Sequence, residues 1–197
     1  MNLRCFIAIG IPDPIKQEIG NLLDILRKYD VDIKWVALEN VHLTLKFLGD
    51  TPEALLPGIR ESILTIVSSY EPFYIKIYGT GVFPNKKYPK VIWVGIVNSE
   101  ALVNLQGDIE NSMSLLGYKK EDKAFNPHLT MGRVRNQRGI FSIVNEIDIF
   151  QDKDFGTFRS DRLKFMKSEL KPKGPDYTCL FDMPFGKREV PGRSLSG

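Results

Sequence analysis

The segments "VHLTLKFLGD" (residues 41–50) and "NPHLTMGRVR" (residues 126–135) contain the only two histidines of this 197-residue chain. Leu-Thr follows both histidines, and residue frequencies give this match a chance on the order of one in a hundred thousand, before allowance for other patterns. A duplicated motif is therefore a better explanation than coincidence. Since one copy lies in each half of the chain, the pattern predicts a quasi-duplicated protein with two lobes.

Apolar periodicity and turn residues predict an α+β fold. Strands are expected at 3–10, 33–38, 41–49, 73–83, 90–97, 128–134, 155–170 and 177–185. Helices are expected at 14–29, 51–69, 100–116 and 139–150, the last because its apolar spacing outweighs a β-branched content that favours a strand. We expect a bilobal fold with two pseudo-symmetric lobes of largely antiparallel sheet, helices packed outside and a central cleft. Residues 1–185 would form this single domain, and 186–197 a flexible polar tail.

The composition is that of an ordinary globular protein, with 43% hydrophobic and 26% charged residues. No apolar run approaches the roughly 18–20 residues that cross a bilayer, and no secretory signal is evident, so a cytoplasmic protein without membrane contact is expected. In that compartment Cys5 and Cys179 are expected to be free and buried, although one disulfide between them is the alternative. The net charge of +3 allows an anionic partner but does not require one.

Side chains alternate along a strand, so His42 and Thr44 would share one face, as would His128 and Thr130. Two such faces opposite one another would place two imidazoles and two hydroxyls around one small anionic group. Because the unperturbed pKa of imidazole is about 6.5, one ring can be neutral and the other protonated near neutral pH. A neutral ring can take a proton from a nucleophile while the other delivers one to a leaving oxygen. The set predicts metal-free cleavage of a phosphoester, with no cofactor.

Two cationic residues near the motifs are further candidates, each with an alternative interpretation. Strict alternation would turn Arg133 away from His128, but Gly132 lies between them and could mark a bulge that re-aims the arginine toward a phosphate. A surface arginine paired with an acid is the alternative. Lys46 would share the face of His42 and could add positive potential, although a solvated lysine at the end of the strand is the simpler interpretation.

Three other interpretations compete with catalysis. Each histidine, taken alone, is more often structural. A zinc site built from Cys5, His42, His128 and Cys179 lacks the closely spaced ligand pairs of such sites. The same cleft could also belong to a binding module without turnover, which recognises a nucleotide or an RNA end. The presence of both imidazoles and both threonines favours the enzyme.

Several stretches resemble the two-histidine (2H) phosphoesterase superfamily, and in particular its RNA 2′,3′-cyclic phosphodiesterases, also described as bacterial and archaeal 2′-5′ RNA ligases. They cover about residues 3 to 185: "RCFIAI", "WVALENVHLTLKFLGD", "VIWVGI", "FNPHLTMGRVR", "FGTFRSDRLKFMKSEL" and "GPDYT". The resemblance implies a bilobal enzyme that hydrolyses a terminal 2′,3′-cyclic phosphate of RNA to a 2′-phosphate without metal. It also implies possible joining of such an end to a 5′-hydroxyl, notably with halves of transfer RNA (tRNA).

By matching position, the resemblance implies a role for each candidate residue. His42 corresponds to the proton donor and His128 to the proton acceptor. Thr44 and Thr130 correspond to the phosphate-binding threonines, and Arg133 to a substrate-contacting arginine. The motifs themselves are symmetric and do not distinguish the acid from the base. We expect a monomer whose partner is RNA with a 2′,3′-cyclic phosphate terminus.

Overall fold

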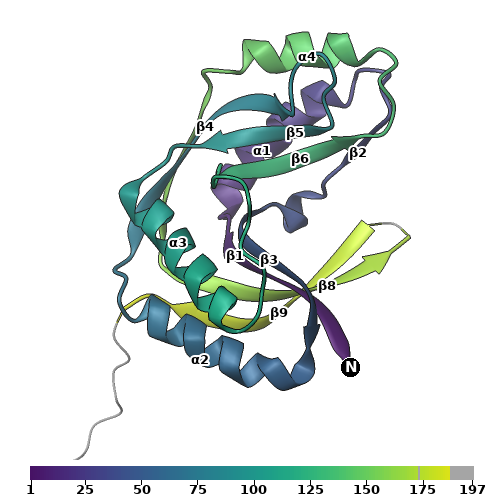
Figure 1. Ribbon diagram of the computed structural model, residues 1–197. Coiled ribbons are helices and arrows are strands. Elements are labelled where there is room, and N and C mark those ends of the chain that lie inside the picture. The colour runs from purple at the N-terminus through teal and green to yellow at the C-terminus, as the bar shows by residue number, and fades with distance from the viewer. Residues whose placement is uncertain (173, 187–197) are drawn as a thin grey trace, which may run out of the picture.

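The computed structural model describes residues 1–172 and 174–186 and has two lobes, each built on one sheet (Figure 1). The strands are β1 (Asn2–Gly10), β2 (Ile33–Trp35), β3 (His42–Pro52), β4 (Phe73–Phe83), β5 (Val91–Ile96), β6 (His128–Val134), β7 (Asp154–Ser160), β8 (Arg162–Lys171) and β9 (Gly174–Pro184). The helices are α1 (Asp13–Leu26), α2 (Leu56–Val67), α3 (Glu100–Leu115) and α4 (Ile140–Ile149), with 3-10 turns η1 (Leu38–Asn40) and η2 (Glu53–Leu55).

Both sheets are antiparallel, and each contains one of the histidine strands. The four-stranded sheet has the order β3-β1-β8-β9, and the five-stranded sheet has the order β2-β6-β5-β4-β7. His42 therefore begins an edge strand of one sheet, and His128 begins an inner strand of the other. The predicted α+β, two-lobed fold is confirmed.

Each sheet is covered by two helices on the face opposite its histidine. α2 contacts β9 and α3 contacts β3, whereas α1 contacts β7 and α4 contacts β4 (Figure 1). The helix that follows β1 thus crosses to the other lobe. Its apolar stripe is buried in that lobe, and comprises Ile15, Ile19, Leu22, Leu23 and Leu26. Each such side chain contributes about 1.5–3 kcal/mol on full burial.

The segment 155–170, predicted as one strand, is two strands in different sheets. β7 pairs with β4 in the five-stranded sheet, whereas β8 pairs with β1 and β9 in the four-stranded sheet. The break falls at Asp161, between buried Ser160 and the start of β8. Buried residues recur on both sides of the break, Phe155 before it and Leu163 and Phe165 after it. Periodicity alone therefore could not show that the chain changes sheets here.

Other elements differ from the predictions only at their ends. The helix expected from residue 51 begins at Leu56, because Thr51 and Pro52 still pair with β1. The ambiguous segment 139–150 is helical, as predicted, over Ile140–Ile149. Apart from Gly186, the predicted tail 186–197 lies outside the described residues. Among the helices described, none combines the length and apolar character needed to traverse a bilayer.

Candidate active site

Both histidine strands contain a β-bulge at the same place in the motif. On β3, Thr44 faces Ala8 and Lys46 faces Ile7, so Leu45 is the extra residue. On β6, Thr130 faces Trp93 and Gly132 faces Ile92, so Met131 is the extra residue. A bulge shifts the alternation of side chains by one position. The two lobes therefore repeat the motif in their backbone geometry as well as in their sequence.

These bulges determine which residues join each histidine. We call the face of each sheet that carries its histidine the inner face; the opposite face packs on the helices. Leu43 and Leu129 are fully buried on the helix side. Beyond the bulge, Phe47 returns to the inner face of the first sheet and is 56% exposed. By the same count, Arg133 falls on the inner face beside His128 and Thr130, and it is exposed.

The two imidazoles are anchored in the same way. His42 Nδ1 lies 2.7 Å from the carbonyl oxygen of Asn40, and His128 Nδ1 lies 2.8 Å from that of Asn126. A carbonyl oxygen only accepts hydrogen bonds, so Nδ1 must carry the hydrogen in both rings. Nε2 is then the nitrogen that gains or loses a proton. An asparagine stands two residues before each histidine in the sequence, but its backbone carbonyl makes the contact, and every residue type has that group.

Aromatic side chains hold the planes of both rings. Phe6 of β1 stacks on His42 with ring centres 4.7 Å apart, and Tyr177 of β9 meets the same imidazole edge-on at 5.3 Å. Phe83 of β4 meets His128 edge-on at 5.0 Å. Sequence reasoning did not find these contacts, because they depend on the order of strands in each sheet. They limit the rotation of the imidazoles about their side-chain bonds.

The electrostatic environment of the site includes groups from both sheets. Burial lowers the pKa of His42; the hydrogen bond to the Asn40 carbonyl opposes this, and the charge of Lys16 adds to it. Burial raises the pKa of Tyr177, while the charges of Arg133 and Arg4 oppose that rise. Arg133 belongs to the five-stranded sheet and Tyr177 to the four-stranded sheet, so the arginine acts across the boundary between lobes. β3 and β6 also contact each other directly.

Lys46 is neither solvated nor beside His42, so both interpretations made from the sequence are wrong. The bulge at Leu45 turns its side chain to the helix side, where the residue is only 2% exposed. Its ammonium group pairs with Glu110 of α3 at 2.6 Å. Alternation without the bulge would have placed it on the inner face.

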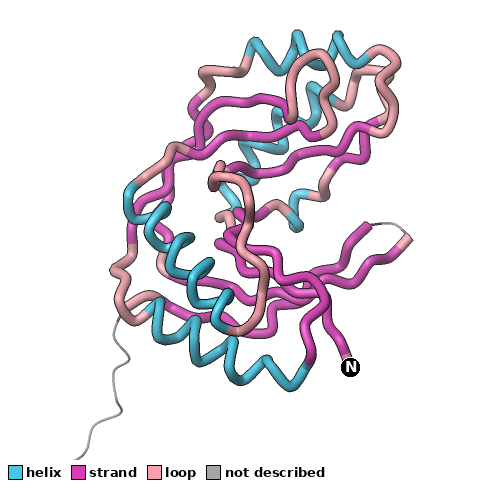
Figure 2. The backbone as a smooth tube through the Cα atoms, in the orientation of Figure 1, coloured by secondary structure: helices cyan, strands magenta, loops and turns pink. Residues whose placement is uncertain are grey.

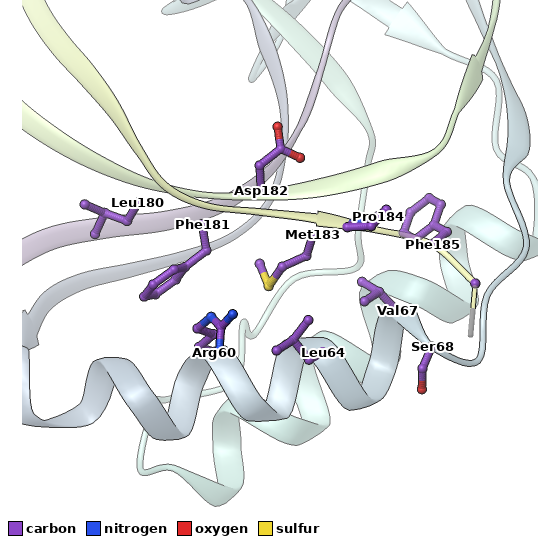
Figure 3. A pocket seen from close by; sticks show the side chains of 11 residues that line it. Arg60, Leu64, Val67, Ser68, Leu180, Phe181, Asp182, Met183, Pro184 and Phe185 are labelled. Atoms are coloured by element: carbon purple, nitrogen blue, oxygen red, sulfur yellow. The ribbon is translucent and has the colours of Figure 1, made fainter. Parts of the chain in front are cut away.

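A pocket of about 490 Å³ lies elsewhere, between α2 and β9 (Figure 3). Its lining includes Arg60, Leu64, Phe181 and Met183, and neither histidine. Phe181 and Met183 pair with Phe165 and Leu163 of β8, which point to the helix side. The pocket is therefore on the face opposite His42. Because both histidines lie elsewhere, the candidate site for proton transfer is on the inner faces instead.

The cysteines do not form a cross-link, and their positions differ from the prediction in part. Both are free, but only Cys5 is buried, whereas Cys179 is exposed. Cys5 lies in the core cluster on the helix side of β1. Within residues 1–172 and 174–186, no three side chains of His, Cys, Asp or Glu converge as a metal site would require.

The inner faces together provide two imidazoles anchored through Nδ1, two hydroxyls and one guanidinium, and within residues 1–172 and 174–186 no hydrogen bond occupies either Nε2. Two lobes that each present a His-x-Thr strand define a phosphoesterase of the two-histidine class. The chain belongs to the family described as LigT like Phosphoesterase, which matches residues 9–93 and again residues 94–177. Each matched segment contains a helix, a histidine strand and another helix in that order, so the duplication inferred from the motifs extends to the elements.

Curated relatives span almost the whole chain. A Methanothermobacter thermautotrophicus protein named RNA 2′,3′-cyclic phosphodiesterase is 35% identical over 180 residues, which is 91% of this chain and 97% of the relative. A Methanocaldococcus jannaschii protein of the same name is 39% identical over 178 residues, with 90% and 98% covered. The family resemblance seen in the sequence is confirmed.

Solved structures share the fold. A protein of Thermus thermophilus superposes with a TM-score of 0.78 at 27% identity, covering 94% of this chain and all of that one. The apo form of E. coli LigT gives a TM-score of 0.71 at 19% identity, covering 95% and 99%. At that identity the second likeness concerns the fold alone.

Proposed function

We propose that this protein is an RNA 2′,3′-cyclic phosphodiesterase that hydrolyses the cyclic end to a 2′-phosphate by paired histidine acid–base catalysis. The observation that carries the proposal is the duplicated Asn-x-His-Leu-Thr motif, whose two imidazoles have matching Nδ1 anchors and lie on the inner faces of different sheets. Curated relatives of that name at 35% and 39% identity support it.

In the proposed reaction, His128 Nε2 accepts a proton from water as the water oxygen forms a bond to phosphorus. The bond from phosphorus to the 3′ oxygen breaks, and that oxygen takes the proton of His42 Nε2. Thr44 and Thr130 donate hydrogen bonds to the non-bridging oxygens, and Arg133 balances their charge. The donor and acceptor roles follow the family, and they exchange in the reverse reaction. The residues named supply each proton transfer without a metal or cofactor.

The lowered pKa of His42 fits a proton donor in the presence of substrate. Burial disfavours the imidazolium form in the free protein. An anionic phosphate beside the ring favours the charged form, so substrate binding would favour protonation of His42 Nε2, next to the leaving oxygen. A ring that holds its proton weakly also releases it readily to the leaving oxygen.

We further propose that the protein acts as a cytoplasmic monomer on RNA ends such as tRNA halves, and that it can join such an end to a 5′-hydroxyl as a 2′-5′ linkage. Ligation would use the same groups in the same roles, with the 5′-hydroxyl in place of water. His128 would accept the proton of that hydroxyl as its oxygen bonds to phosphorus, and His42 would protonate the leaving 3′ oxygen. One structural neighbour, E. coli LigT, has been solved in complex with 3′-AMP, so a nucleotide is a ligand of that protein.

The test is incubation of a short RNA ending in a 2′,3′-cyclic phosphate with the protein in excess chelator. We expect addition of one water and a 2′-phosphate product, at a rate that His42→Ala and His128→Ala each lower by about 10²–10⁴-fold. Thr157→Val, an exposed change on β7, serves as the control. Binding of the RNA without any product would favour the second candidate, a non-catalytic RNA-end binding protein, which the same inner faces could also form.

A further inference from the structure

A buried charge cluster connects the two histidine strands, and the proposed reaction does not use it. Lys46 lies on β3 two residues beyond Thr44, and its ammonium group is buried on the helix side. It pairs with Glu110 at 2.6 Å and donates to the carbonyl oxygen of Lys119 at 2.8 Å. Burying a charge in a protein core is costly unless the group is paired and hydrogen-bonded. A buried lysine at this position is therefore stable only with these two partners, whereas an apolar side chain would fill the same space without them.

Glu110 of α3 extends this cluster in two directions. The oxygen that binds Lys46 also accepts the backbone N–H of Glu121 at 2.8 Å. The other oxygen accepts from Gln106 at 3.3 Å, and Gln106 also reaches the carbonyl oxygen of Leu45 at 3.5 Å. Leu45 is the bulged residue of the first motif. The cluster therefore holds the bulge of β3 and two points of the segment after α3.

That segment leads directly to the second histidine. Residues 116–127 run from the end of α3 to the start of β6 as a long loop (Figure 2). The cluster holds the loop at Lys119 and Glu121, and five residues later Asn126 supplies the carbonyl anchor of His128. β3 and β6 lie in different sheets, so no ladder of backbone hydrogen bonds joins them. They contact each other, and β2, which pairs with β6, leads through η1 to His42. The cluster adds a second connection, which reaches the segment that carries Asn126.

We propose that Lys46 and Glu110 are positioning residues that fix His128 relative to His42 by tethering the 119–127 segment to β3. The device is one-sided, because the second motif has Gly132 at the position that corresponds to Lys46. This inference rests on the proposed acid–base function, since the spacing of the two rings matters only if both act in one step. A displacement of about 1 Å at a catalytic group can lower the rate by about 100-fold.

The test replaces the pair by apolar residues of similar size. Lys46→Met/Glu110→Leu removes both tethers without leaving an unpaired buried charge, and such replacements are often neutral or stabilising. We expect a folded protein whose kcat for cyclic phosphate hydrolysis falls about 10- to 100-fold with little change in KM. Lys119→Met is the matched control, because its side chain is 81% exposed and pairs with Asp122 outside the cluster, which holds only the Lys119 backbone. This control should keep the kcat of the unaltered protein.

A mutant cycle separates positioning from general damage. In a His128→Ala background the pair should no longer matter, so the double change should lower the residual rate by less than about threefold. Glu110→Gln retains an oxygen that can accept from Glu121, and it should keep more kcat than the double variant. If the double variant fails to fold, the same comparison of kcat with and without His128→Ala is made with Glu110→Gln, which should lower kcat only when His128 is present.

Two results would overturn the inference: unchanged kcat in a folded double variant, or an equal loss with and without His128. A protein that never hydrolyses the cyclic end would instead refute the proposed function itself. The two failures are distinguishable, because the first requires an active unaltered protein.

Discussion

Removing the hydroxyls of Thr44 and Thr130 tests the proposed phosphate contacts most directly. Both residues are half-buried on the inner faces. Among the hydrogen bonds of residues 1–172 and 174–186, none involves either side-chain hydroxyl, whereas Thr51 and Thr80 both use theirs. Thr→Val at either position therefore breaks no internal bond, and the free energy of unfolding should change by less than about 1 kcal/mol.

The expected loss of activity follows from the energy of one charge-assisted hydrogen bond. A bond to a charged group contributes about 1.5–3 kcal/mol, and each 1.4 kcal/mol is a factor of ten. Each single variant should therefore lose about 10- to 100-fold in kcat/KM. If the hydroxyls hold different oxygens, their effects add, and the double variant should lose about 100- to 10,000-fold.

The assay is hydrolysis of an end-labelled RNA with a 2′,3′-cyclic phosphate, followed under conditions where rate is proportional to substrate. Thr157→Val is again the control, because its side chain is exposed on β7. Unchanged kcat/KM in the Thr44→Val/Thr130→Val variant would refute the phosphate-binding roles. A loss in only one single variant would show that the duplicated motif is not used symmetrically.

Three further outcomes are expected. Proton NMR should show that the pKa of His42 in the free protein is below the ordinary histidine value, and added phosphate should raise this pKa. If His42 is the proton donor, kcat/KM should fall as the pH rises through the pKa of the free protein. An increase of kcat/KM in this pH range would contradict the role of proton donor. Phe6→Leu should cost about 1–3 kcal/mol in urea unfolding through lost ring contacts with His42 and Tyr177, and should lower kcat more than stability alone explains; full activity would count against ring orientation by Phe6. Gly132→Ala should lower the free energy of unfolding by about 1–3 kcal/mol, since the added methyl group would lie 2.8 Å from side chains of β2. Gly107→Ala, in open space on α3, should instead raise it by about 0.5–1 kcal/mol. Equal effects of the two changes would refute the packing argument.

The family assignment gives these experiments a common reference. Matches to residues 9–93 and 94–177 divide the chain between the two histidines, so the residues of each motif have counterparts in the other half. Thr44 can be compared with Thr130, and Phe47 with Arg133. The last pair shows where the lobes differ: one inner face presents an exposed aromatic ring at this position, and the other presents a charge.

The sequence by itself determined the features that depend on local pattern. The repeated His-Leu-Thr marked the candidate residues, alternation placed each histidine beside its threonine, and apolar spacing predicted four helices and most strands. The tertiary structure decided what depends on neighbours distant along the chain. Strand order brought Phe6, Tyr177 and Phe83 against the imidazoles, and a bulge that pairing alone reveals sent Lys46 into the core toward Glu110. Periodicity describes one strand at a time, whereas register and sheet membership are set by partners. The break at Asp161 therefore required the folded chain, and so did the position of the bulge before Arg133, which falls at Met131.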